Sequence, residues 1–502
     1  MSDLTYQMIA LVAYLLAMLA IGAWAYRRTT NLDDYMLGGR DLGPMVSALS
    51  AGASDMSGWL LMGLPGAIYA TGLVEGWIAV GLTVGAWLNW KVVAPRLRTY
   101  TEVSGNSITV PSFLENRLKD GSRLLRVASG LVIVVFFTFY VSSGMVAGGV
   151  FFESSFNASY HTGMLVVAAV VVAYTLFGGF LAVSYTDFVQ GTIMLLALIA
   201  VPVVGLFVTG GIGSTADSIR EVDPNHLSML EGATTLGVLS ALAWGLGYFG
   251  QPHIIVRFMA LRTAREAVAA RRIGIGWMLL SLFGAVGTAL VGIAYYRQNP
   301  DAELTDPEAV FIALGQIIFH PLVAGVLLAA VLAAIMSTIS SQLLVTSSAL
   351  VEDLYKAVFK TNASQSQLVL FGRLAVLAVS VIAAVLAWQK TGSVLDLVAY
   401  AWAGFGGSFG PIILLSLWWR KLTAAGALAG LVTGAVTVVV WGNINALSSQ
   451  MYEIVPGFAL NTLVAVVVSL VTYRANPAIE AEFDEAVRLV DADDPREDAA
   501  RA

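Results

Sequence analysis

One acidic residue, Asp55, lies in the middle of a long apolar segment, within the sequence Ala51-Gly-Ala-Ser-Asp-Met-Ser-Gly58. A carboxylate at bilayer depth costs about 2.5–3.5 kcal/mol even on a lenient insertion scale, so it needs a compensating interaction. Asp55 could cap a second half-helix by accepting from its first amides. Since serine or asparagine would cap at lower cost, we favour a cation site, for sodium or a proton, beside unwound carbonyl groups.

Three residues of a later apolar segment share one helix face. Ala334, Ser337 and Thr338 stand at i, i+3 and i+4, so one carbonyl and two hydroxyls can point the same way. Sodium is a hard cation that prefers oxygen ligands. Hydroxyls in membrane helices also bond to their own i−4 carbonyl or hold neighbouring helices together, and the spacing alone favours this second interpretation.

Aromatic residues accompany a second unusual segment, Trp244-Gly-Leu-Gly-Tyr-Phe-Gly-Gln-Pro252. Trp244 and Tyr248 are one helical turn apart, Pro252 follows after another turn, and Tyr140 lies in an earlier apolar run. Such rings can hold an ammonium group and pack a small aliphatic ring, although they more often fill helix contacts. No Lys or Arg is expected deep in the membrane, so an anionic ligand group would use half-helix N-termini, hydroxyls or a bound cation. This favours a zwitterionic substrate.

Two charged residues near the ends of apolar runs allow two interpretations each. Asp187 is expected at the inner end of a span, as a helix cap or as a functional group. Arg40, just before the segment of Asp55, is either a gate or a topology anchor.

The composition places these residues in a membrane. The chain has 502 residues, 58% apolar and 12% charged, about half the charged share of a soluble protein. The fold class is therefore an all-α polytopic membrane protein. Apolar runs of about 20 residues predict thirteen transmembrane helices, near 6–26, 43–69, 74–95, 124–152, 160–183, 186–210, 234–258, 273–296, 321–350, 368–389, 393–419, 423–443 and 453–473.

The charges predict an orientation. With the N-terminus outside, nearly all of the 27 basic residues fall in inner loops, and the exceptions are Arg220, Arg297 and Lys390. This asymmetry predicts an outside N-terminus and an inside C-terminus. The stretch 309–319 is too short to span and is expected to lie on the outer face. The tail 476–502 carries the whole net charge of −6 and is expected to be disordered in the cytoplasm.

The two glycine-rich segments predict an internal repeat. Glycine, proline and polar residues at mid-membrane depth indicate helices that unwind around a cavity. These two spans are five apart and run in opposite directions, as expected of two five-helix halves with inverted topology. We therefore divide the chain into a first helix and inner loop (1–40), the first repeat (41–210), the second repeat with outer loops (211–420), two peripheral helices (421–475) and the tail (476–502).

Several classes of function are disfavoured. The chain has no cysteine, its four histidines are widely separated, and no phosphate-binding loop occurs, so a membrane hydrolase, a metalloenzyme or an ATP-driven pump is not expected. The acidic balance argues against nucleic-acid binding. A channel is harder to exclude, but two broken helices in inverted halves favour alternating access.

Several runs resemble the sodium/solute symporter family, and within it the branch that transports proline. They are Arg40-Asp-Leu-Gly-Pro44, residues 47–66, residues 244–253, Met336-Ser-Thr338, Glu352-Asp-Leu-Tyr-Lys356 and Tyr400-Ala-Trp-Ala-Gly-Phe-Gly406. The likeness covers nearly the whole chain, excepting loops 210–235 and 297–307 and the tail.

The resemblance implies a sodium-coupled importer of L-proline in the bacterial cytoplasmic membrane, in contact with membrane lipid, with a LeuT-like five-plus-five core. It implies that co-transported sodium is held by the carbonyls of Ala53, Met56 and Ala334 and the hydroxyls of Ser337 and Thr338, with Asp55 in support. It places proline near Ser57, Gly58, Trp59, Tyr140, Trp244, Tyr248 and Pro252, and gives Arg40 and Asp187 less direct roles in gating or coupling. The alternatives are another small amino acid or betaine-like solute, a proton in place of sodium, a channel, or a membrane sensor that binds proline.

Overall fold

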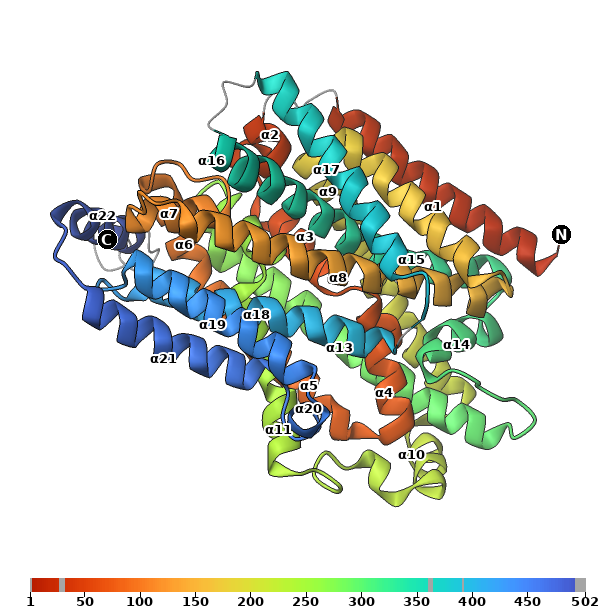
Figure 1. Ribbon diagram of the computed structural model, residues 1–502. Helices are drawn as coiled ribbons and strands as arrows, with labels where there is room; N and C mark the ends of the chain where they lie inside the picture. Colours follow the sequence, from red (N-terminus) through yellow and green to blue (C-terminus); the bar gives the residue numbers. More distant parts are fainter. Residues whose placement is uncertain (1, 27–31, 360–363, 391, 493–502) are drawn as a thin grey trace, which may run out of the picture.

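The computed structural model describes residues 2–26, 32–359, 364–390 and 392–492, and every regular element within them is helical (Figure 1). The first part of the chain forms α1 (Asp3–Tyr26), α2 (Leu32–Leu37), η1 (Gly38–Arg40), α3 (Pro44–Asp55), η2 (Trp59–Gly63), α4 (Leu64–Thr71), η3 (Leu73–Glu75), α5 (Gly76–Leu88), η4 (Asn89–Val93), α6 (Ala94–Val103), α7 (Val110–Leu118), α8 (Leu124–Phe156) and α9 (Tyr160–Val208). The second part forms α10 (Gly211–Val222), η5 (Pro224–Leu227), α11 (Thr235–Leu242), η6 (Ala243–Gly250), α12 (Pro252–Met259), α13 (Glu266–Gln298), η7 (Pro307–Ala309), α14 (Val310–Ile318), α15 (Pro321–Ser348), η8 (Ala349–Tyr355), α16 (Lys356–Phe359), α17 (Gln365–Leu386), α18 (Val394–Trp418), α19 (Ala424–Gly442), α20 (Asn445–Ser448), α21 (Ile454–Thr472) and α22 (Pro477–Ala492).

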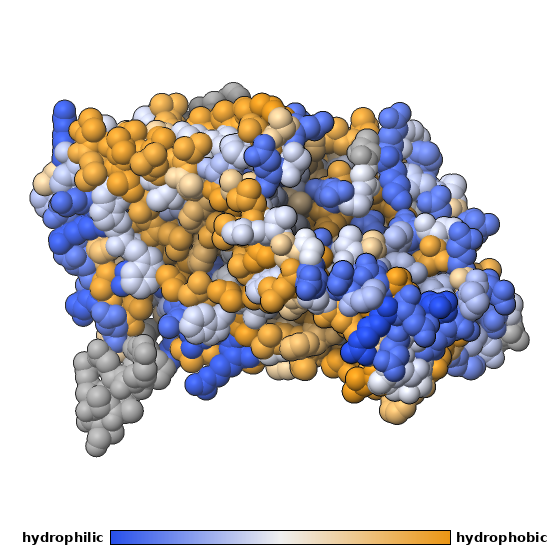
Figure 2. Space-filling model, turned by 90° about the horizontal axis from the view of Figure 1, so that it is seen from below, coloured by the Kyte–Doolittle hydropathy of each residue, from blue (hydrophilic) through white to orange (hydrophobic). Residues whose placement is uncertain are grey.

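Ten helical segments in the described residues are long and apolar enough to cross a membrane. Shorter apolar helices cover parts of three further predicted spans, at Trp59–Thr71, Tyr160–Leu176 and Thr235–Gly250. The total of thirteen spans stays a prediction. Much of the face shown in Figure 2 is apolar, and hydrophilic side chains gather toward its two ends.

The two predicted broken helices are confirmed. The first changes from α3 to the π-helical η2 through Met56, Ser57 and Gly58, and the second changes from α11 to α12 through the 3₁₀ segment η6 and Gln251. Both lie inside the helical bundle. Helix α3 packs against α9, α12, α13 and α15, and η6 packs against α5 and α18, while α1, α19 and α21 lie farther out (Figure 1).

Glycines allow α5 to approach the second break closely. A Cβ atom on Gly85 would lie 2.2 Å from the carbonyl oxygen of Gly245, and one on Gly81 would lie 2.5 Å from that of Leu242. Because these neighbours are backbone atoms, they could not move aside as a flexible side chain can.

The boundary between the fifth and sixth predicted spans differs from the expectation. Residues 160–208 form α9 with a break at Gly179, whose φ of 58° favours glycine. A Cβ atom there would meet the Tyr35 carbonyl oxygen at 2.9 Å. The second helix of α9 thus begins several residues earlier than predicted, so Asp187 lies inside a helix and the interpretation as a cap is wrong.

The expectation of a disordered tail is wrong for residues 477–492, which form α22. The high charge of the tail hid an amphipathic pattern, in which Ile479, Phe483, Ala486 and Val490 recur at helical spacing. Ala486 is buried, and α22 packs against α6 and α7, beside which it lies in Figure 1. Residues 493–502 lie outside the described part of the chain.

Candidate ion and substrate site

The break after α3 frees a backbone carbonyl group. In a continuous helix the amide of Ser57 would donate to the carbonyl oxygen of Ala53, but here it donates to that of Asp55 at 3.0 Å. The Ala53 carbonyl group is thereby released from the helical ladder. Met56, whose carbonyl group the resemblance also implies, is fully buried at the end of α3.

The freed carbonyl group meets hydroxyls of α15. The Ser337 hydroxyl donates to the Ala53 carbonyl oxygen at 2.7 Å and to the Ala334 carbonyl oxygen at 3.1 Å. The Thr338 hydroxyl donates to the same Ala334 oxygen at 3.2 Å. Four of the five oxygens implied by the resemblance are therefore joined in one buried group, which connects the first break to α15.

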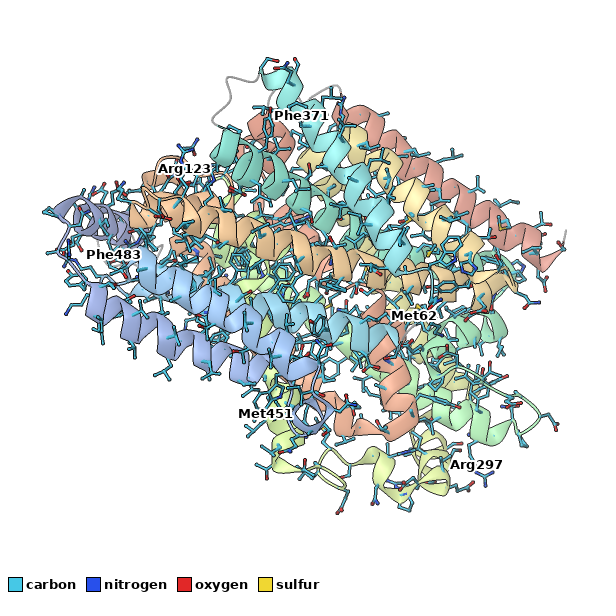
Figure 3. All side chains as sticks on the ribbon, viewed as in Figure 1. Met62, Arg123, Arg297, Phe371, Met451 and Phe483 are labelled. Atoms are coloured by element: carbon cyan, nitrogen blue, oxygen red, sulfur yellow. The ribbon has the colours of Figure 1, made fainter. Side chains whose placement is uncertain are left out.

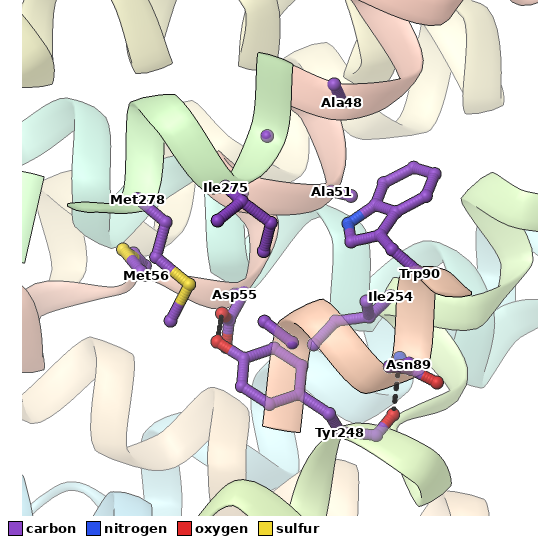
Figure 4. A pocket seen from close by; sticks show the side chains of 13 residues that line it. Ala48, Ala51, Asp55, Met56, Asn89, Trp90, Tyr248, Ile254, Ile275 and Met278 are labelled. Carbon is purple, nitrogen blue, oxygen red and sulfur yellow. Dashed lines mark hydrogen bonds between the residues drawn. The ribbon is translucent and has the colours of Figure 1, made fainter. Parts of the chain in front are cut away.

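Asp55 joins the two broken helices. Its Oδ2 atom accepts a short hydrogen bond from the Tyr248 hydroxyl of η6, and its buried Oδ1 atom has no hydrogen-bond partner among the described residues (Figure 4). The Asn89 amide donates to the Tyr248 carbonyl oxygen at 2.9 Å and fixes that part of η6. Beside Asp55 is a cavity of about 20 Å³, room for a water molecule or a small ion.

Aromatic rings from both breaks, from α18 and from the segment before α21 form a cluster, which we call the ring cluster: Trp59, Trp244, Tyr248, Trp402 and Tyr452. The ring centroids of Trp59 and Trp244 are 6.5 Å apart, and Trp244 stacks on Tyr452 at 5.4 Å. Tyr248 meets Trp402 edge-on at 5.1 Å, and the Trp402 indole donates to the Trp244 carbonyl oxygen at 2.8 Å. The cluster thus brings together three of the seven residues expected near a substrate.

The other four residues expected near a substrate lie at the breaks themselves or beside them. Ser57 and Gly58 form the first break, where a Cβ atom on Gly58 would lie 3.1 Å from Ala147 of α8. Pro252 begins α12 after the second break. Tyr140, also on α8, meets the ring of His253 edge-on at 5.9 Å, next to Pro252.

Asp187 forms a buried ion pair that the sequence did not predict. Its Oδ2 atom lies 3.0 Å from Nη2 of Arg257, and both side chains have no exposed surface. The hydroxyl of Ser50 donates to Asp187 at 2.7 Å, and Arg257 donates to the Ser341 hydroxyl at 2.6 Å. This network joins α3, α9, α12 and α15. Charge counting assigned Arg257 to an inner loop, and that assignment is wrong, because Arg257 lies in α12 and is buried against its neighbours.

Arg40 holds together the segment that precedes α3, the end of α12 and the region of α6. It donates to the carbonyl oxygen of Met259 at 2.8 Å, to that of Ser107 at 2.7 Å and to the Thr101 hydroxyl of α6 at 3.1 Å. Nearby, the Leu42 amide donates to the Ala260 carbonyl oxygen at 3.1 Å. We call the contact of residues 40–42 with residues 259–262 the inner junction, after the side to which the charge pattern assigns it.

The model of the Sodium:solute symporter family matches residues 35–434, which include both breaks, the ring cluster except Tyr452, and the inner junction. The chain belongs to this family. It is therefore a multi-pass membrane protein and a member of a transporter family, not of an enzyme family.

Three curated proteins are similar in sequence to this chain over most of its length. The high-affinity proline transporter PutP of Bacillus subtilis is 62% identical over 93% of this chain and 98% of its own. The osmoregulated proline transporter OpuE of the same organism is 53% identical over 93% of this chain and 95% of its own. A sodium/proline symporter of Staphylococcus aureus is 50% identical over 97% of this chain and 96% of its own.

Solved structures confirm the fold expected of this family. A Na⁺-coupled sialic acid symporter in a substrate-bound outward-open state matches with a TM-score of 0.80 at 18% identity, over 94% of this chain and 99% of its own. Mhp1, a nucleobase-cation-symport-1 family transporter, matches with a TM-score of 0.56 at 14% identity, over 91% of this chain and 100% of its own. MhsT in complex with L-phenylalanine matches with a TM-score of 0.51 at 15% identity, over 85% of this chain and 98% of its own. The predicted LeuT-like fold is therefore confirmed.

The sequence did not single out Trp402, Tyr452 or Arg257. Trp402 and Tyr452 lie far along the chain from the residues they contact, and one sequence carries no signal for such a pairing. The position of Arg257 did indicate that it belongs to the second broken helix, because it follows Pro252 by only five residues and the predicted span 234–258 includes it.

Proposed function

We propose that this chain is a sodium-coupled symporter of L-proline that works by alternating access. Relatives that are 50–62% identical over more than nine-tenths of the chain are named proline transporters, and one group is named for sodium as well. The structural observation that carries the proposal is the contact between Ser337 and the freed Ala53 carbonyl group. It collects neutral oxygens at a helix break beside a buried carboxylate and the ring cluster.

Sodium is the transported cation, held by the carbonyls of Ala53, Met56 and Ala334 and the hydroxyls of Ser337 and Thr338. Two of these carbonyl oxygens and both hydroxyls already lie within hydrogen-bond distance of one another. A hard cation suits such an oxygen set, and the ion would take the place of the hydrogen bonds among them. Asp55 supplies a negative charge from the same break, which offsets the cost of bringing the ion out of water.

L-Proline binds between the two breaks, near Ser57, Gly58, Trp59, Tyr140, Trp244, Tyr248 and Pro252. The aromatic faces of Trp244 and Tyr248 would receive the secondary ammonium group and the aliphatic ring of proline. Its carboxylate would face the backbone amides at the start of η2 and the bound sodium ion, since Arg257, five residues after Pro252, is paired with Asp187. This arrangement suits a zwitterion better than an anion.

The chain lies in the bacterial cytoplasmic membrane with its N-terminus outside and its C-terminus inside. Arg297, which the charge pattern assigns to an outer loop, lies at the opposite end of the molecule from Phe483 of α22 (Figure 3). The inner junction then faces the cytoplasm, where Arg40 and the Asp187–Arg257 pair hold the inner halves of the two broken helices together. Release of these contacts would open the inner path.

Uptake of radiolabelled L-proline into proteoliposomes under an inward sodium, proton or potassium gradient tests this proposal. We expect uptake only with sodium, and competition by an excess of unlabelled proline but not of glycine betaine. Uptake driven by protons alone would contradict sodium coupling. Binding of proline without any uptake would support a sensor, and sodium-driven uptake of another solute but not of proline would contradict the substrate.

A further inference from the structure

The acidic C-terminal helix α22 lies on a basic surface at the inner end of the molecule. Lys119 forms a short ion pair with Glu482, and Arg420 pairs with Asp484 at 2.7 Å and with Glu480 at 3.4 Å. These groups are 26–57% exposed. Partly exposed ion pairs of this kind are weakened by salt, because counter-ions screen them over a distance of about 10 Å at 0.1 M.

Beneath α22 lies a buried cation that α22 covers. Arg117 of α7 has no exposed surface and donates to the Ser416 carbonyl oxygen at 3.2 Å, but its two Nη atoms have no hydrogen-bond partner among the described residues. Its guanidinium lies between the rings of Tyr100 and Phe483, at 5.1 and 5.2 Å. Burial lowers the pKa of Arg117, and the charge of Glu482 on α22 acts in the opposite direction. Helix α22 therefore supplies both a ring and a negative charge to a cation that has no carboxylate partner of its own.

Helix α6, which lies under α22, also contacts the inner junction. Helix α6, which packs against α22 on one side, packs against α12 on another. Arg98 of α6 donates to the carbonyl oxygen of Arg262 at 2.8 Å and to that of Leu261, and Thr101 of the same helix accepts from Arg40. A displacement of α6 would therefore disturb the contacts that hold the inner ends of the broken helices together.

We propose that α22 is a strap, docked through Lys119, Arg420 and the Arg117–Phe483 contact, that stabilises the closed inner junction through α6 and is released when ionic strength on the inner side rises. This inference rests on the proposed function, because opening of the junction matters only in an alternating-access cycle. High salt would screen the docking pairs, undock α22 and favour the arrangement that is open to the inside.

Cysteine labelling tests the strap without measuring transport. Because the chain has no cysteine, a single introduced one is the only thiol that reacts with a maleimide. Ala486→Cys reports undocking, since Ala486 is 3% exposed on the packed face of α22. Ser47→Cys reports opening of the junction, since the buried Ser47 hydroxyl donates to the Arg257 carbonyl oxygen at 3.0 Å.

Both variants are labelled in lipid nanodiscs, which expose both membrane faces, at 50 and 500 mM KCl without sodium or proline. We expect the labelling rate of each cysteine to rise about threefold or more at high salt. Adding Glu480→Gln, Glu482→Gln and Asp484→Asn should give the Ser47→Cys chain the high rate already at low salt. Glu485→Gln is the matched control, because Glu485 pairs with Arg488 of α22 itself, and it should leave the salt response intact.

Three results would overturn the strap: no salt response at Ala486→Cys, a response there without one at Ser47→Cys, or a salt response that survives the triple charge removal. Sodium-driven proline uptake by the chain without any substitution, measured separately, tests the proposed function. Absence of uptake there, with intact salt-dependent labelling of the cysteine variants, would contradict the proposed function while leaving the strap in place.

Discussion

The Ser337 hydroxyl donates a 2.7 Å hydrogen bond to the Ala53 carbonyl oxygen, which links α15 to the broken end of α3 across 284 positions of the chain. The link depends on the break, because a continuous helix would engage the Ala53 carbonyl group in its own ladder. The oxygen atoms of this hydroxyl and this carbonyl group could both bind a cation that takes the place of the hydrogen bond between them.

Removing this hydroxyl should weaken sodium binding. We expect Ser337→Ala to raise the sodium Kd about tenfold, equivalent to about 1.4 kcal/mol, while proline binding at saturating sodium is retained. Sodium-dependent proline binding to the purified protein measures this. Ser380→Ala is the control, because the Ser380 hydroxyl donates to Val376 of its own helix and should have no effect. An unchanged sodium Kd in Ser337→Ala would remove Ser337 from the ion site.

The hydrogen bond from Tyr248 should support the charge of Asp55. Tyr248→Phe keeps the ring against Trp402 but removes the bond to a buried carboxylate, a contact typically worth about 1.5–3 kcal/mol. We therefore expect uptake at low sodium to fall at least tenfold and to recover partly when sodium is raised. Uptake equal to wild type at low sodium would show that Asp55 does not depend on this bond.

The buried pair of Asp187 and Arg257 should be required for stability. Neutralising one partner leaves an uncompensated buried charge, at a cost of about 3–5 kcal/mol. We expect Asp187→Asn to lower the unfolding temperature in detergent strongly, and the double variant with Arg257→Gln to regain part of the loss. Asp41→Asn, which breaks the exposed pair with Arg262, should change it little. Equal effects of the buried and exposed changes would contradict this account.

The close approach of α5 to the second break should not tolerate a methyl group. Gly85→Ala would place a Cβ atom 2.2 Å from a backbone oxygen of Gly245, so we expect a large loss of folded protein in the membrane. Gly276→Ala is the matched control, because nothing lies within 4 Å of its added Cβ atom and alanine favours a helix. Normal amounts of the Gly85→Ala protein would show that α5 and η6 can separate.

Local signals predicted the elements of this site better than the contacts between them. The glycines and the proline around Asp55 and Pro252 identified both breaks, because unwinding is encoded in neighbouring residues. The ion pair of Asp187 with Arg257 spans 70 positions, and charge counting assigned Arg257 to a loop. Helix α22 was missed because its charge was weighed without the spacing of Phe483 and Ala486, which was visible in the sequence.

The accumulation of L-proline in proteoliposomes, measured against an imposed membrane potential, tests sodium-coupled symport most directly. With equal sodium on both sides, one inward sodium charge per proline at −100 mV, about 2.3 kcal/mol, should concentrate proline about 50-fold inside. The same potential without sodium should give no accumulation. An internal concentration that stays equal to the external one in the presence of sodium, or that rises without sodium, would contradict the account.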